Sequence, residues 1–395
     1  MKLYPANRRR FAWTLGLLVV AIAIDVAAHL PKGKPVAPRP ADAVRLVSTS
    51  YRIDRLYASM QGPLSRQRDI YLAEAVKSSR YWITGVKLHV VNGEASREES
   101  QDWFCHANLT LPGDGANEPS STSRADPMIM RTLAVKPVET PLDQHRRLNP
   151  DNSDLDHRLF TLVPGRNEIE FPEGFGIPMR DVEPLELMTM ALNLNTPHPD
   201  KEIRFSTDVS ISTNQTLNPV FRRAIYGHVT ATPETTPRPE AMCVAPLVGE
   251  KALMGATCGP DMMDFRPAQV LAQFGENQIM HWIIPPGTHF YTNDVTAQFR
   301  LPSDTTIHYA TGHLHPFGRR LTLLERQADG KESPLVTITA KSRTDRLGIE
   351  EISEIKSRDG IPIHQNSKFT LVTEYDNPTG KPIDAMSILY LYMAE

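Results

Sequence analysis

The stretch FTLVTEYDNPTGKPIDAMSILYLYM, residues 369–393, decides the fold class of this chain. Two runs in which apolar and polar residues alternate flank a Pro-Thr-Gly-Lys turn signal, so the stretch predicts a β-hairpin. Alternation of the same kind returns at WITGVKLHVV (82–91), FTLVPGRNEIEF (160–171), EIRFSTDVSIS (202–212) and LTLLERQADGKESPLVTITAK (321–341), the last also read as a hairpin. The chain is therefore predicted to be mostly β.

Helical periodicity is confined to short pieces, SRQRDIYLAEAVKSS at 65–79 and RPAQVLAQFG at 266–275. With 33 prolines and 22 glycines, turn signals recur at intervals that favour antiparallel sandwiches over a parallel sheet with crossover helices. We therefore expect an all-β protein of two tandem jelly-roll-like antiparallel β-sandwich domains behind an N-terminal membrane anchor. The domains are expected at 48–216 and 217–395, after a Pro-rich linker at 31–47.

The N-terminus carries an export signal. Arg8, Arg9 and Arg10 precede a mainly apolar run at 11–30 that contains one charged residue, Asp25. Val26 to Ala28 could serve a signal peptidase, which would release the protein; an uncleaved anchor is the favoured alternative. The positive-inside rule then predicts an extracytoplasmic body, periplasmic if the host is bacterial, with no other membrane contact than this helix.

Composition narrows the function further. A formal net charge of −3 over 395 residues offers no field that would attract nucleic acid, so nucleic-acid binding is set aside. Of three cysteines, Cys243 and Cys258 could close a disulfide loop, which leaves Cys105 over. The same loop contains Met242, Met254, Met262 and Met263, so a Cu(I) acquisition site is the alternative to a disulfide loop with buried methionines.

The segment TGHLHPFG, residues 311–318, holds the strongest chemical signal. Side chains alternate along a strand, so His313 and His315 share one face and His308 lies on the other. Two imidazoles at this spacing can clamp a copper or zinc ion. The spacing also suits two histidines that are only hydrogen-bonded at the rim of a sandwich.

GHLHPFG (312–318), followed by EYDNPTGKPIDAMSILYLY (374–392), resembles the second domain of the copper type II, ascorbate-dependent monooxygenases, the family of peptidylglycine α-hydroxylating monooxygenase and dopamine β-monooxygenase. WIIPPGTHFYTNDV (282–295) and YASMQGP (57–63) resemble family segments as well. The resemblance implies that His313, His315 and Met386 bind the copper that meets O₂. It also implies a catalytic neighbour, Tyr390, four positions after the methionine.

The first domain departs from the family pattern. Where the family has two consecutive histidines of a second copper site, this chain has Cys105 and His106. Asn193 stands where a third histidine would be, with His198 as a possible substitute. A Cys-His pair could still hold Cu(I), but strand alternation points the two side chains to opposite faces unless a bulge intervenes. The expectation is one copper per chain rather than two.

The positions that contact substrate in the peptide-amidating member of the family also carry different residues in this chain. Thr311 replaces an arginine that grips a carboxylate there, and Ile388 replaces a polar asparagine. Two functions follow: a copper-dependent monooxygenase that uses O₂ and a reductant such as ascorbate to hydroxylate a small molecule other than a peptidylglycine, or a non-catalytic copper-binding or interaction protein on the same fold. The electron donor is not specified by the sequence.

Overall fold

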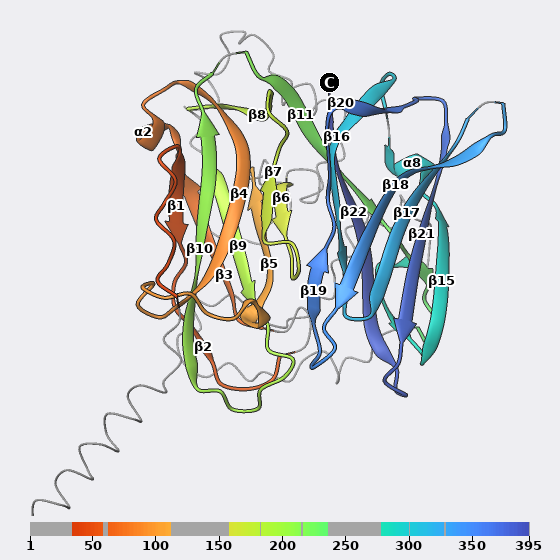
Figure 1. The fold of residues 1–395 in the computed structure, drawn as a ribbon, viewed down its shortest axis with the longest axis horizontal. Coiled ribbons are helices and arrows are strands. Elements are labelled where there is room, and N and C mark those ends of the chain that lie inside the picture. The colour runs from red at the N-terminus through yellow and green to blue at the C-terminus, as the bar shows by residue number, and fades with distance from the viewer. Residues whose placement is uncertain are drawn as a thin grey trace, which may run out of the picture.

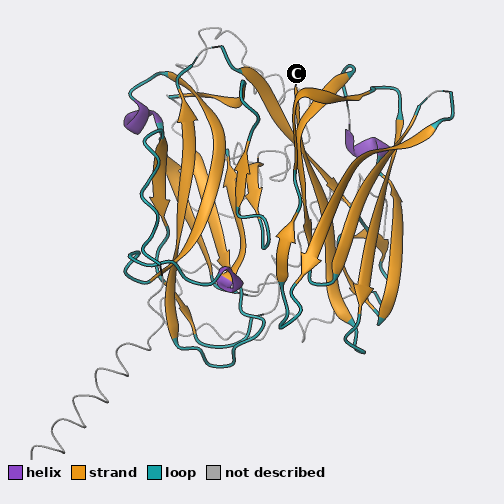
Figure 2. Ribbon diagram, in the orientation of Figure 1, coloured by secondary structure: helices purple, strands orange, loops and turns teal. Residues whose placement is uncertain are grey.

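A computed structural model describes residues 34–57, 62–111, 158–181, 183–214, 216–235, 278–299, 301–327 and 329–394. Almost all of the regular structure is β (Figure 2). The all-β, jelly-roll-like architecture predicted from the sequence is confirmed. The predicted anchor, the Cys243–Cys258 loop and the helix at 266–275 lie outside the described residues. Within the described part of the chain, no helix is both long and apolar enough to span a membrane.

The first lobe is a sandwich of two sheets (Figure 1). Its core forms because alternate side chains of both sheets point inward, and the rings of Tyr51 and Phe104 meet Phe205 at centroid distances of 5.1 and 5.7 Å. One sheet has the order β1 (Ala43–Val47), β10 (Lys201–Ser212), β4 (Arg80–Asn92) and β8 (Phe175–Arg180), with β2 (Tyr51–Ile53) on β10 and β7 (Glu168–Glu170) on β4. The other has the order β3 (Leu64–Ile70), β9 (Leu185–Ala191), β5 (Phe104–Thr110) and β6 (Arg158–Leu162).

The second lobe repeats this two-sheet plan. One sheet has the order β11 (Asn218–Tyr226), β22 (Ile383–Ala394), β16 (Thr305–Leu314) and β20 (Ile355–Ile363), with β14 (His281–Ile284) also on β22. The facing sheet has the order β15 (Gly287–Asp294), β21 (Lys368–Asn377), β17 (Gly318–Arg326), β18 (Glu332–Ser342) and β19 (Ile349–Ile352). Short elements complete the described chain: β12 (Val229–Thr230), β13 (Gln278–Ile279), α2 (Ala73–Val76), η1 (Gln101–Trp103) and α8 (Thr296–Phe299).

Two local predictions are wrong. The first six residues of the helix expected at 65–79 belong to strand β3, which pairs with β9 from Leu64 onward, and only Ala73–Val76 is helical. The stretch 369–393 contains two strands, but they do not form a hairpin: β21 pairs with β15 and β17, whereas β22 pairs with β11, β14 and β16. In both places pairing with distant strands overrides the local pattern. The hairpin predicted at 321–341 is confirmed as β17 and β18.

The two lobes share one continuous sheet. Strands β8 and β11 pair in parallel through Phe175 and Asn218, which joins the larger sheet of the first lobe to that of the second. Side chains reinforce the junction: the ring of Phe171 lies 4.8 Å from that of Tyr392, and the Tyr392 hydroxyl donates to the Leu159 carbonyl at 2.9 Å. The face of β22 that carries Tyr392 is therefore the face turned toward the first lobe.

Candidate metal centre

Strand β22 is the platform on which the candidate ligands gather. Its register pairs His281 of β14 with Met386, and His313 of β16 with Ile388. Directly opposed residues of an antiparallel pair project to the same face, and residues two apart on a strand do so too. His281, His313, Asp384 and Met386 therefore share the face that is turned toward the first lobe.

The buried hydroxyl of Tyr375 fixes the backbone beneath these ligands. It accepts hydrogen bonds from the backbone N–H groups of His315, at 3.1 Å, and Met386, at 3.3 Å. It donates to the Met386 carbonyl at 2.6 Å. Tyr375 comes from β21 in the facing sheet, so one side chain crosses the core and holds the end of β16 against β22.

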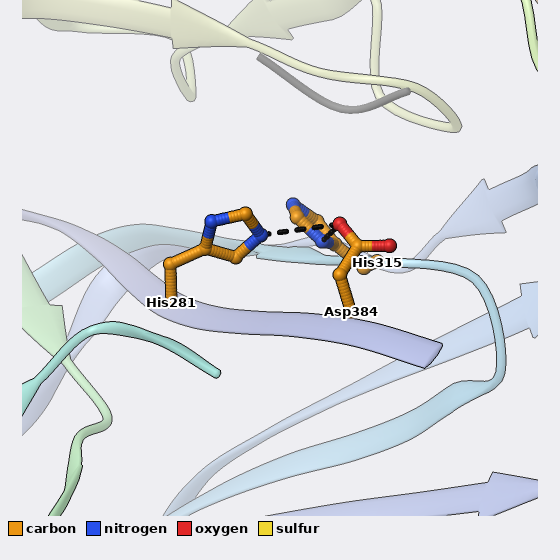
Figure 3. A group of neighbouring side chains, drawn as sticks. All are labelled: His281, His315 and Asp384. Carbon is orange, nitrogen blue, oxygen red and sulfur yellow. Dashed lines mark hydrogen bonds and ion pairs between the residues drawn. The ribbon is translucent and has the colours of Figure 1, made fainter. Parts of the chain in front are cut away.

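Asp384 binds two of the histidines with a single oxygen (Figure 3). His281 Nε2 lies 3.1 Å from Asp384 Oδ2 in a hydrogen bond, and His315 Nδ1 lies 2.9 Å from the same oxygen. The three donor atoms lie within 4.8 Å of one another. The contact of His315 Nδ1 is an ion-pair contact that does not meet the geometry of an aligned hydrogen bond.

The histidine rings are arranged edge to face. Ring centroids of His313 and His315, and of His281 and His315, are both 5.1 Å apart, at interplanar angles of 83° and 80°. His315 is only 4% exposed, and Nδ1 of His313 is also buried without a partner. Burial, together with the charges of its neighbours, lowers the pKa of His313 well below its ordinary value. A neutral buried imidazole with a free nitrogen is the form that binds a metal ion.

Asp384 supplies the negative charge of the cluster. Desolvation acts to raise its pKa, but the charge of His315 and the hydrogen bond from His281 prevail and hold the pKa well below its usual range. Its side chain is 36% exposed, so the carboxylate lies at the solvent rim of the cluster. The chain thus combines imidazole, carboxylate and thioether groups on one sheet face.

In the first lobe the structure resolves the Cys105 and His106 ambiguity. A bulge interrupts β5 between Phe104 and His106, so the two side chains are adjacent, with His106 Nδ1 3.4 Å from Cys105 Sγ. Burial, then Arg158 and His315, lower the pKa of His106 to about 3. His106 therefore faces the second-lobe cluster, while Cys105 packs in a small apolar group with Met190.

The other first-lobe candidates lie apart from this arrangement. The Asn193 side chain is buried and donates to the carbonyls of Arg55 and Thr196, which is a structural role. His198 is exposed on a loop at φ 53°. Neither residue is brought to His106 by any contact of the described chain.

The family-implied substrate positions are buried in the junction between the lobes. The Tyr390 ring stacks under the Arg222 guanidinium at 4.6 Å, and burial raises the pKa of Tyr390 to about 12. The Thr311 hydroxyl donates to the Ser353 carbonyl at 3.0 Å, so it is engaged within the protein. Ile388 is also buried.

Sequence reasoning missed His281, Asp384 and Tyr375. Asp384 lies two residues before Met386, so alternation alone puts both on one face. No comparable signal exists for His281, because its position follows from the pairing of β14 with a strand about 100 residues further along the chain.

Comparisons with known proteins do not assign this chain to a family. No family model matches the chain, and no curated protein matches it. Similar solved structures include the major capsid protein P2 from bacteriophage PM2 (10% identity, TM-score 0.29, covering 89% of this chain and 97% of that one). Others are the cowpea mosaic virus top component (9%, 0.35, 93% of each chain) and the STIV MCP (7%, 0.29, 92% and 97%). At these scores the likeness transfers no function.

Proposed function

We propose that this chain binds copper through His313, His315 and Met386 and is a copper-dependent, O₂-using monooxygenase. The observation that supports the proposal is the arrangement around β22: His313 lies opposite Ile388, two residues from Met386, and the Tyr375 hydroxyl bonds to the backbones of both His315 and Met386. Two neutral imidazoles and a thioether suit an ion that cycles between Cu(I) and Cu(II).

The chemistry that bound copper would supply is reductive O₂ activation. In balanced form a substrate C–H bond, O₂, two electrons and two protons give C–OH and water. The electrons come from an external reductant such as ascorbate. The chain's own residues would orient the ligands and exclude water, and Tyr390 would line the approach from the first lobe as the expected catalytic neighbour.

The proposed substrate is a small molecule that the protein does not bind through a carboxylate group of the substrate. Thr311 lies at the position of the family's carboxylate-binding arginine, and its hydroxyl donates a hydrogen bond to the Ser353 carbonyl. Ile388, two residues after Met386, adds apolar surface to the same strand face. Both features favour a less polar substrate than a peptidylglycine.

Non-catalytic copper binding is the second candidate, and the first lobe favours it. The two-copper chemistry of the family needs a second set of three ligands, but only Cys105 and His106 are adjacent here, whereas Asn193 donates to backbone carbonyls. Electron delivery would then lack its usual second centre.

Copper stoichiometry under reducing conditions tests the binding. We expect about one copper per chain, lost in His313→Ala and in Met386→Leu and retained in His106→Ala, from the count of soft ligands. Cys105→Ala should also retain it. Two coppers per chain, one of them lost with His106→Ala, would instead restore a two-copper mechanism.

Oxygen uptake separates the two candidates. Copper-loaded protein with ascorbate and a panel of apolar small molecules should consume O₂ and form one hydroxylated product per O₂, and His313→Ala should not. Copper binding without substrate-dependent O₂ uptake would favour the non-catalytic candidate.

A further inference from the structure

A second set of donors lies beside the soft ligands. His281, His315 and Asp384 offer Nε2, Nδ1 and Oδ2, all within 4.8 Å of one another. The set shares His315 with the proposed copper ligands but contains no sulfur. It draws on three strands or strand ends of one sheet: β14, the end of β16 and the start of β22.

From this geometry we propose that His281, His315 and Asp384 hold a divalent transition-metal ion, in a site of two imidazoles and one carboxylate. The inference rests on the proposed function only in that both ligand sets use His315. Nitrogen and oxygen donors suit Zn(II) or oxidised copper, whereas the thioether of Met386 suits Cu(I).

The short contact of His315 is the first support. Its Nδ1 lies 2.9 Å from Asp384 Oδ2 but forms no aligned hydrogen bond within the described chain. A cation next to both atoms would be stabilised by this close pair of a ring nitrogen and a carboxylate oxygen. Nδ1 is buried, with His315 4% exposed, so water does not satisfy it.

The donor spacing is the second support. Donors at ~2.0–2.1 Å from an ion lie about 2.9 Å apart when their bonds are perpendicular and about 3.4 Å apart in a tetrahedron. The observed separations from Asp384 Oδ2 are 2.9 Å to His315 Nδ1 and 3.1 Å to His281 Nε2. Both of these fall within that range, and the third separation, between the two ring nitrogens, is at most 4.8 Å.

Access to the site fits an exchangeable ion. The side chains of Asp384 and His281 are 36% and 20% exposed, so solvent reaches the site on their side. The side chain of His315 is 4% exposed and forms the buried side of the site. The Tyr375 hydroxyl fixes the backbone of His315, which limits how far its ring can retreat when the ion leaves.

Titration calorimetry with Zn(II) tests the proposal on the full chain. Zn(II) affinity should fall at least about tenfold in His281→Ala and in Asp384→Asn and stay within about twofold in Met386→Leu. Cu(I) affinity should instead fall in Met386→Leu and change less in His281→Ala and Asp384→Asn. Thermal melts of each variant identify any that fail to fold.

X-ray absorption at the zinc edge on the unaltered protein provides a readout that needs no variant. Nitrogen and oxygen scatterers at ~2.0–2.1 Å without sulfur are expected. A sulfur scatterer, absence of Zn(II) binding, or unchanged Zn(II) affinity in both His281→Ala and Asp384→Asn would overturn the inference. Failure of the proposed function looks different: Cu(I) binding would be absent or indifferent to Met386.

Discussion

At the scale of single residues, the Tyr375 hydroxyl fixes the backbone of two candidate ligands without being a ligand itself. It satisfies two backbone N–H groups and one carbonyl next to His315 and Met386. Its ring is fully buried, so no water replaces it there. The positions of two candidate ligands therefore depend on one oxygen atom from the opposite sheet.

Replacing Tyr375 with phenylalanine should weaken both stability and metal binding. The buried backbone groups would lose their partner, which costs about 1–3 kcal/mol of unfolding free energy in urea denaturation. Copper affinity should drop about tenfold, because the ligand backbones loosen. Tyr392→Phe is the matched control: it loses one hydrogen bond, to the Leu159 carbonyl, away from the ligands. Equal copper affinities in the two variants would contradict a positioning role.

The sequence was informative about residues wherever alternation along one strand was enough. His313 and His315 share a face by alternation, and Met386 entered through the resemblance. His281 and Tyr375 could not be assigned, because each reaches the site through pairing or packing between strands far apart in the chain. The adjacency of Cys105 and His106 needed a bulge, which alternation does not predict.

At the scale of elements, the two sheets of the second lobe are tied by an ion pair between His364 and Glu325. His364 follows β20, and Glu325 belongs to β17 and is 3% exposed. One carboxylate oxygen accepts from the His364 backbone N–H at 3.1 Å and contacts ring Nδ1 at 2.9 Å. The hydrogen bond to Glu325, aided by Asp304, raises the pKa of His364.

This raised pKa predicts how stability changes with pH. The ion pair contributes fully below the unfolded pKa of about 6.5, and its contribution disappears as pH rises through the higher folded pKa. Since His364 is 43% exposed, we expect only roughly 0.5–1 kcal/mol. His364→Gln should therefore be less stable than the unaltered protein near pH 5.5 and nearly equal to it near pH 8.5, measured by urea denaturation. A difference independent of pH would exclude this linkage.

Element-level prediction from sequence succeeded for strands with strong alternation and failed where sheet partners decided the outcome. The 65–79 segment has helical spacing, yet β3 pairs with β9 along its first half. The 369–393 segment has a turn signal, but its strands enter facing sheets. Turn chemistry specifies a reversal of the chain and does not specify which strands pair afterwards.

At the scale of the whole molecule, hydrogen bonds and ion pairs cross between the lobes at several points. Arg166 donates to the Ile352 carbonyl at 2.9 Å and pairs with Glu354 at 3.3 Å. Further along, the Asn195 amide and the Leu347 backbone exchange two hydrogen bonds, of 2.8 and 3.0 Å. These contacts attach β19 and its flanking residues to the first lobe.

Arg166→Ala should lower the unfolding free energy by about 2 kcal/mol, because the buried Ile352 carbonyl loses its donor. We expect the loss to affect both lobes together. Fluorescence of variants that keep only Trp82, in the first lobe, or only Trp282, in the second, should report one common midpoint. Separate midpoints would mean that the lobes unfold independently.

The parallel pairing of β8 with β11 has a consequence for any attempt to divide the chain. Severing it near residue 217 would leave β8 with an open edge and would expose the rings of Phe171 and Tyr392, which now cover each other. Unpaired strand edges beside apolar surface are templates for aggregation. Half-chains of this protein would therefore associate with one another rather than persist as soluble sandwiches. In the intact chain each lobe covers the strand edge and the aromatic rings of the other.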